Sequence, residues 1–364
     1  LAWAVQASLH RSGDLSAPNY YLNNTGRMMA NVSVQLQKQF SHHFRSGLYF
    51  STYNTNIGIL RGAHIGNLTD LQQAFERELP FYTESNFSYG IESPRQLVQH
   101  HLLKWDSKYF FNDRQWLKTI VSGQINWRRE YDIRRNSNNT APAMSILQYN
   151  TFAAATYHHQ FEFFKAQGLF KTGLQGSYTD NTNQAGTGIL PLLPDYSKAN
   201  LAAFATLSFK TKKLLIDVGL RGDFIFQEVL YISNDLPRRI IRDPRNFNNL
   251  SSIAGFSYRF TKAIELKYAL SFASRNPAIN EMYSYGLHQG ISGIEEGNIN
   301  LNTERGLKNN LQLTVDIAQK IKFSTQVFHQ YFENYIYFQA EEKPRLTIRG
   351  AFPVYVYQQT DAQI

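Results

Sequence analysis

Three pairs of adjacent histidines are the residues whose type and spacing could bind a metal ion: His42-His43, His100-His101 and His158-His159. Each pair lies in or beside a stretch that predicts a β-strand, and neighbouring side chains of a strand point to opposite faces. Two adjacent imidazoles therefore cannot bind the same ion. The chain has no cysteine, which excludes thiolate metal sites, cysteine nucleophiles and disulfides. We predict no metal site and no cofactor.

Enzymes and nucleic-acid-binding proteins are not favoured by the remaining patterns. The chain has no Gly-x-Ser-x-Gly elbow, no phosphate-binding loop and no His-Glu-x-x-His pattern. A net charge of +9 could attract nucleic acid. There is no long basic block, however, and lysines gather in predicted turns such as Lys210-Thr211-Lys212-Lys213. We therefore predict that the chain is not an enzyme and has no nucleic-acid partner.

Charged residues alternate with apolar residues along the predicted strands. In 214–227, Ile216, Leu220 and Phe224 fall on one face, and the other face is polar. The stretches 117–130, 264–275 and 310–317 repeat this alternation. A lipid-facing arginine or lysine at mid-depth of a bilayer would cost about 2–4 kcal/mol. We therefore predict that the polar set faces a wet or plugged lumen: Asn126, Arg128, Glu130, Asp217, Arg221, Asp223, Glu265 and Lys267.

The predicted strands are long, and their connections alternate in length. The pattern indicates about fourteen strands, near 1–10, 27–40, 43–54, 97–110, 115–131, 146–160, 162–178, 199–209, 214–230, 250–260, 263–274, 308–318, 321–337 and 346–358. Many exceed the roughly 9–11 residues that cross a bilayer. Short turns (41–42, 111–114, 210–213, 261–262 and 319–320) alternate with long loops (11–26, 55–96, 132–145, 179–198, 231–249, 275–307 and 338–345). This predicts an all-β fold, a transmembrane antiparallel up-and-down β-barrel with short periplasmic turns and long extracellular loops.

The stretch 274–304 carries the most specific pattern in the chain. It resembles the barrel signature of TonB-dependent outer-membrane receptors, in which an Arg-x-Pro turn precedes Glu-Leu-Tyr/Phe, a Gly-x-His loop and Glu-x-Gly-Asn-x-x-Leu-x-x-Glu. The residues that match in order and spacing are Arg275, Pro277, Glu281, Tyr283, Gly286, His288, Glu295, Gly297, Asn298, Leu301 and Glu304. Met282 replaces the usual leucine, and Ile299 stands where a proline often follows Gly-Asn. The stretches 219–223 and 124–130 resemble two further strands of this family.

Physical reasoning assigns roles to several of these residues. Arg275, at the lumen end of a strand, is expected to pair with Glu281 or Glu304. Gly297 and Asn298 are expected to permit a turn with positive φ. Most of the matching residues are expected to shape the loop. The better candidates for substrate contact are two aromatics and an imidazole, which can stack on or hydrogen-bond a bulky chelate: Tyr283, Tyr285 and His288.

The resemblance implies an N-terminal plug inside a barrel of about 22 strands. It also implies the outer membrane of a Gram-negative bacterium and uptake of a bulky, scarce nutrient driven through the TonB complex, which the plug contacts. Residues 1–364 show neither a plug nor the final strands, so we expect them to form a single β-barrel segment. Ferric siderophore is the family's commonest cargo, followed by haem, cobalamin and glycans. The basic balance favours an anionic chelate.

Other classes remain open from the sequence alone. A barrel of about fourteen strands could be a passive diffusion porin or a fatty-acid-type channel. A surface adhesin, an enzyme barrel or a soluble all-β protein would also be rich in strands. The substrate, the complete number of strands and the oligomeric state are not determined by these patterns.

Overall fold

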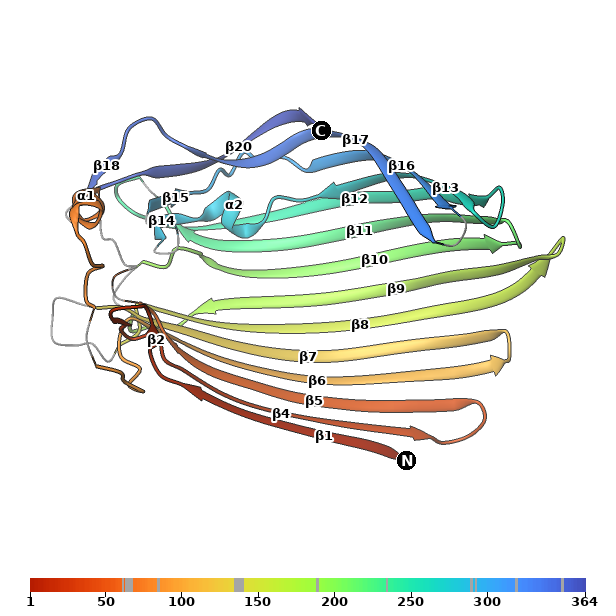
Figure 1. The fold of residues 1–364 in the computed structure, drawn as a ribbon, viewed down its shortest axis with the longest axis horizontal. Coiled ribbons are helices and arrows are strands. Elements are labelled where there is room, and N and C mark those ends of the chain that lie inside the picture. Colours follow the sequence, from red (N-terminus) through yellow and green to blue (C-terminus); the bar gives the residue numbers. More distant parts are fainter. Residues whose placement is uncertain are drawn as a thin grey trace.

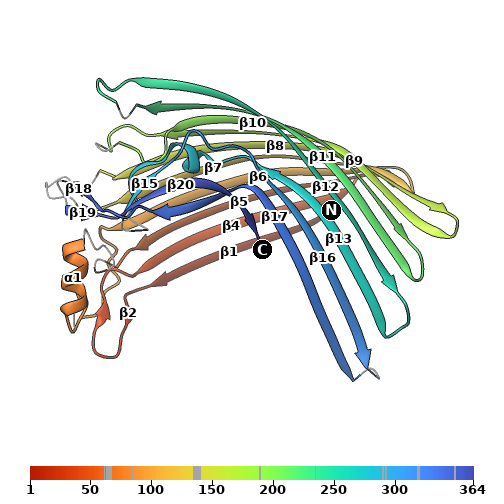
Figure 2. The same ribbon diagram turned by 90° about the horizontal axis from the view of Figure 1, so that it is seen from above.

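One large curved sheet dominates the molecule (Figure 1). A computed structural model describes residues 1–60, 62, 68–83, 86–133, 141–187, 190–233, 235–288, 291, 293–317, 320–347 and 350–364. Within these residues, 16 strands form the sheet in the order β1-β4-β5-β6-β7-β8-β9-β10-β11-β12-β13-β16-β17-β20-β15-β14. Short turns lie at one end of the strands, and the long connections lie at the other (Figure 1). Seen from above, the sheet is curved and does not close (Figure 2).

Antiparallel neighbours in chain order make up most of the sheet. The strands are β1 (Ala2–Ser12), β4 (Arg27–Gln39), β5 (Phe44–Gly58), β6 (Arg95–Asn112), β7 (Gln115–Tyr131), β8 (Met144–Phe163), β9 (Ala166–Asn183), β10 (Asp195–Lys210), β11 (Leu214–Ile232), β12 (Ile240–Arg259), β13 (Ile264–Arg275), β14 (Tyr285–His288), β15 (Gly293–Glu296), β16 (Glu304–Ile317), β17 (Ile321–Ala340) and β20 (Val354–Gln363). Two small hairpins and two helices lie outside it: β2 (Leu15–Ser16) with β3 (Tyr21–Leu22), β18 (Arg345–Thr347) with β19 (Gly350–Phe352), α1 (Leu68–Glu76) and α2 (Ile279–Tyr283).

The predicted all-β, up-and-down architecture is confirmed, and three predicted boundaries are wrong. The predicted loop 231–249 is mostly strand, because β11 runs to Ile232 and β12 begins at Ile240. The predicted strand 346–358 is divided into β18, β19 and the start of β20. The turn between β8 and β9 lies at Phe164-Lys165 and not near 161, and both residues have positive φ (46° and 65°), as a two-residue hairpin requires. Parts of the predicted loops 55–96, 132–145, 179–198, 231–249 and 275–307, and residues 318–319, lie outside the described residues.

Strand register sorts the side chains onto two faces, because directly paired residues share a face. One line of pairs across β7 to β12 runs Asn126, Gln148, Asn181, Tyr196, Val229 and Asp243. On the same face, Asp217 pairs with Gly255, and Ser257 pairs with Lys267. All eight residues predicted to face the lumen lie here, on what we call the polar face.

The opposite face, which we call the apolar face, exposes large hydrophobic side chains. Leu174 is 62% exposed, Leu201 is 60% exposed and Val327 is 67% exposed. Others on this face are Leu103, Val121, Ile125, Trp127, Leu220, Phe224, Leu270 and Leu311. An apolar surface this extended is unusual for a protein in water. Among the described residues, no helix has the length and apolar character to cross a membrane.

Candidate functional site

Residues 276–303, which we call the inserted segment, leave the sheet between two strands that are direct neighbours, β13 and β16. The sequence predicts a loop here, and the structure shows α2, β14 and β15 instead. Met282, Tyr283 and Leu301 form a buried cluster with Val229 and Ile336. Val229 belongs to the polar face, so the inserted segment packs on that face. β15 then pairs in parallel with β20, which joins the segment to the last strands in the order of the sheet.

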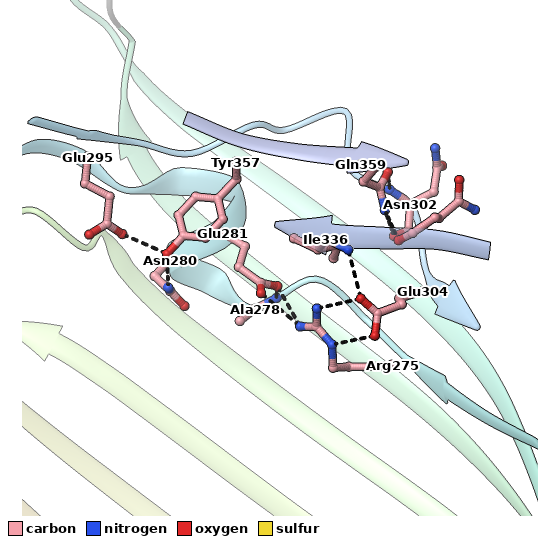
Figure 3. Close-up of polar contacts among 11 residues, drawn as sticks. Arg275, Ala278, Asn280, Glu281, Glu295, Asn302, Glu304, Ile336, Tyr357 and Gln359 are labelled. Atoms are coloured by element: carbon pink, nitrogen blue, oxygen red, sulfur yellow. Dashed lines mark hydrogen bonds and ion pairs between the residues drawn. The ribbon is translucent and has the colours of Figure 1, made fainter. Parts of the chain in front are cut away.

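Arg275 links both ends of the inserted segment (Figure 3). Its Nη1 donates to the two carboxylate oxygens of Glu281 at 3.0 and 2.8 Å, and its Nη2 donates to Glu304 Oε2 at 3.1 Å. Glu281 Oε2 also accepts from the backbone N–H of Ala278 at 2.6 Å, at the start of α2. Glu304 Oε2 accepts from the buried backbone N–H of Ile336 at 2.9 Å. Both pairings expected for Arg275 are therefore present, and they join β13, α2, β16 and β17.

A second polar cluster joins the inserted segment to β20 (Figure 3). Glu295 is 4% exposed. Its Oε2 lies 2.5 Å from His288 Nδ1, and its Oε1 accepts from the Tyr357 hydroxyl at 3.3 Å. The same hydroxyl accepts from Asn280 Nδ2 at 3.0 Å. Asn298 donates to the Tyr357 carbonyl at 3.3 Å, so one tyrosine of β20 contacts three parts of the segment.

Tyr283 is a core residue of this site. It is 7% exposed, and its hydroxyl donates to Asp243 Oδ2 at 2.7 Å. Burial and the hydrogen bond to Asp243 raise the pKa of Tyr283, which keeps its hydroxyl protonated as a donor. Arg245 binds the same carboxylate at 3.0 Å and donates to the Ile299 carbonyl at 2.8 Å. Tyr283 therefore leaves little surface for a ligand.

Gly297 is required for close packing rather than for a turn with positive φ. Neither Gly297 nor Asn298 has positive φ, so that expectation is wrong. A Cβ at Gly297 would lie 2.4 Å from the carbonyl carbon of Met282 and 2.5 Å from the backbone nitrogen of Tyr283. Gly297 N–H donates to the Ser284 carbonyl at 2.7 Å. The glycine lets two backbone segments touch directly. Pro277, in the same inserted segment, is also fully buried.

Replacing Gly297 by alanine should destabilise the inserted segment by about 1–3 kcal/mol, the usual cost of overpacking. The obstructing atoms are backbone, which cannot rotate away. Proteolysis of the folded protein should show faster cleavage within 276–303. Gly222→Ala is the matched control, because a Cβ there meets nothing within 4 Å. Equal cleavage of the two variants would contradict the packing argument.

Comparison with known proteins assigns this chain to a family. The family model for the TonB dependent receptor-like β-barrel matches residues 7–363. The chain belongs to this family. No curated protein sequence matches it.

Three solved structures illustrate the likeness to this family's fold. The hemophore receptor HasR of Serratia marcescens, a double mutant in complex with its hemophore HasA and heme, has 15% identity and a TM-score of 0.69, covering 99% of this chain and 55% of that chain. The ferric-catecholate import receptor Fiu of E. coli has 10% identity and a TM-score of 0.69, and the match covers 99% of this chain and 56% of Fiu. The copper transporter OprC has 12% identity and a TM-score of 0.68, covering 99% and 52%. The chain thus spans a little over half the length of these structures.

On this TonB-dependent receptor-like barrel, Tyr285 and His288 keep exposed surface. Tyr285 is 44% exposed, and its backbone N–H donates to the Leu192 carbonyl at 3.1 Å. The His288 side chain is 42% exposed, although Nδ1 contacts Glu295. Both residues belong to β14, which lies at the end of the long connections (Figure 1). No group of three or more His, Asp or Glu side chains among the described residues could hold a metal ion.

The eight polar-face residues largely form local charge pairs. Arg221 pairs with Asp223 at 2.7 Å and donates to Gln175 at 2.6 Å. Arg128 pairs with Glu130 at 2.5 Å, and Lys267 pairs with Glu265 at 3.3 Å. Asn126 lies 3.3 Å from His100 Nδ1. In each of these pairs the cation and the carboxylate belong to the same strand, so charge is balanced locally.

Sequence reasoning missed three residues of the site: Asp243, Arg245 and Tyr357. The first two fall in the predicted loop 231–249, where polar residues and Pro244 obscure the strand pattern. Tyr357 falls in a predicted strand with nothing to distinguish it from other strand tyrosines. No local signal could have joined them to the inserted segment.

Proposed function

We propose that this chain forms the barrel of an outer-membrane receptor that takes up a bulky, scarce nutrient, a ferric siderophore or similar metal chelate. The observation that carries this is the family match over residues 7–363. The exposed apolar face supports a lipid contact, because hydrocarbon favours such a surface and penalises the charges of the polar face. The proposed location is the outer membrane of a Gram-negative bacterium, and the proposed energy source is the TonB complex.

Among the described residues, the sheet has an edge strand, β1, with one side that has no partner strand. β1 pairs only with β4, and an unpaired backbone edge in hydrocarbon costs several kcal/mol. We propose that residues 1–364 are one barrel segment of a larger protein. Further strands would close this edge, and a plug would fill the lumen and contact TonB. Sequencing both flanks of the gene tests this, because neighbouring stretches should encode a plug on one side and amphipathic strands on the other.

The substrate proposal rests on charge and on exposed groups. The net charge of +9 favours an anionic chelate, and Tyr285 and His288 offer an aromatic ring and an imidazole at the long-connection end. The names of similar structures include a ferric catecholate, heme and copper, so haem and other metal complexes stay as alternatives. A passive porin or a fatty-acid channel would pass solutes without an energy source.

Binding measurements on the full-length receptor in detergent test the proposal. Tryptophan fluorescence should show saturable binding of one ferric siderophore class, and Tyr285→Ala or His288→Ala should weaken it about tenfold. Phe164→Ala is the control, because Phe164 is 88% exposed in a short turn at the opposite end. Saturable binding of an oligosaccharide in place of the chelate, or uptake that continues after the proton gradient is collapsed, would overturn it.

A further inference from the structure

A row of cations crosses the polar face near the short turns. Arg45 of β5 pairs directly with Lys108 of β6, and Lys108 pairs directly with Lys118 of β7. Directly opposed side chains have Cβ atoms about 4.5–5.5 Å apart, and like charges in that position destabilise a sheet. Lys171 of β9 extends the group, because it pairs with His158 of β8 on the same face. We call Arg45, Lys108, Lys118 and Lys171 the cation row.

No carboxylate of the described residues forms an ion pair with the cation row. The nearest acidic side chain on this face of β6 is Asp106, which pairs with Lys104 at 3.9 Å. Glu162, in the neighbouring turn region, pairs with Arg114 at 4.0 Å. The one hydrogen bond of the Arg45 side chain within the described part of the chain goes to the neutral Gln39 Oε1, at 3.0 Å. The positive charge of the row is therefore not balanced by the described chain.

Aromatic rings surround Lys108, the central residue of the row. Lys108 Nζ lies 4.4 Å from the ring centroids of both Phe110 and Trp116. Trp116 stacks on His158, with ring centroids 4.8 Å apart and an angle of 11° between the planes. His158 Nδ1 is buried and has no hydrogen-bond partner. Lys108 is thus held against packed aromatic rings, and its cation–π contacts partly offset the repulsion from Arg45 and Lys118.

Several cations elsewhere on the polar face have a carboxylate partner, which the cation row lacks. At the same end of the sheet, Arg259 and Lys267 lie 3.7 and 3.3 Å from Glu265. Arg221 has Asp223, and Arg128 has Glu130. The cations of the row instead oppose one another directly on β5 to β7. An anionic species bound beside them would relieve that repulsion.

We propose that the cation row is a binding site for a small multivalent anion that carries several carboxylate or phosphate groups. Three cations in line on adjacent strands match an extended anion with several charges, and lysine and arginine bind both oxyanion classes. A cavity lies two residues further along β5 and β6, where Gly47 pairs with Asp106. The amides of Gln35 and Gln37 in its lining can donate hydrogen bonds to the anion, and Lys104 pairs with the Asp106 carboxylate. As a substrate subsite the row rests on the proposed function, and it then specifies a polyanionic cargo that passes the short-turn end.

Calorimetric titration of the full-length protein in detergent with tripolyphosphate, and separately with citrate, tests the site. Lys108→Gln/Lys118→Gln should weaken binding of the preferred anion by about tenfold or more. Arg259→Gln/Lys267→Gln removes the same charge from the same face and end, and should change affinity less than about twofold. Affinity should fall as salt increases. Comparison of the two titrations separates phosphate from carboxylate ligands.

Three results would overturn the site. These are unchanged affinity in Lys108→Gln/Lys118→Gln, an equal loss in both double variants, or far tighter binding of a polyglutamate peptide, which would assign the row to an acidic polypeptide. Ferric-chelate binding through Tyr285 and His288 is measured separately. If that binding survives while anion binding fails, only the cation row is refuted. If the anion binds but no chelate is taken up, the proposed function fails and the anion site stands.

Discussion

Replacing Ile125 by arginine should lower the free energy of unfolding in lipid vesicles by about 2–4 kcal/mol, the measured range for a lipid-facing arginine near the bilayer midplane of a β-barrel. Ile125 lies in the middle part of β7 on the apolar face and is 41% exposed. In hydrocarbon, a guanidinium at that depth loses its hydration without gaining a partner. Urea titration of the full-length receptor folded into vesicles measures the loss.

Gln124→Arg is the matched control, because the adjacent residue sits at the same depth but on the polar face. Gln124 pairs across the sheet with Leu102 and Asn150. We expect a change within about 1 kcal/mol there, since water in the lumen can hydrate the charge. Equal losses of stability in the two variants would show that both faces contact the same solvent, and would contradict a location in the membrane.

Replacing Glu304 by alanine should lower the free energy of unfolding by about 3 kcal/mol, because two groups lose their partner at once. Arg275 would lose one of its two carboxylates, and the buried backbone N–H of Ile336 would lose its acceptor. The inserted segment should then separate from β16 and β17. Chemical denaturation measures the stability, and proteolysis within 276–303 reports the separation.

The control for Glu304 lies beside it. Glu333 pairs with Arg305 at 3.1 Å, but both side chains are about half exposed, at 45% and 51%. Glu333→Ala should therefore lower the free energy of unfolding by less than about 1 kcal/mol. A comparable loss in both variants would indicate that Glu304 acts as an ordinary surface charge and not as a link between strands.

Periodicity predicted the strands well where one face is apolar and the other is polar. β7, β11 and β13 follow that rule along most of their length, so their positions and faces could be read directly from the residues. The rule fails at 240–249, where Arg242, Asp243 and Asn246 lie near Pro244 and no apolar alternation remains. It also fails at 346–358, where Pro353 divides the run. A proline inside a strand pattern signals a break, and that signal was available in the sequence.

The contacts of the site could be predicted only where the contacting residues belong to the same sequence motif. Arg275, Glu281 and Glu304 share one signature, and chemistry alone pairs their charges. Tyr283 shows the limit, because a tyrosine can equally fill a core or face a ligand, and here it fills the core. Asp243, Arg245 and Tyr357 meet the segment only through the three-dimensional arrangement of β12 and β20. Contacts between such distant stretches leave no mark in a single sequence.

The parallel pairing of β15 with β20 has a consequence for the order of assembly. Ile294 lies beside Val354, and the whole of β16 and β17 separates them in the chain. Hairpins between consecutive strands close short loops and form early, whereas this pairing must wait for the later strands to take their places. We therefore expect the end of the sheet that carries the long connections to form last. Under the proposed function, a barrel that has already inserted would be unable to bind ligand until that final step.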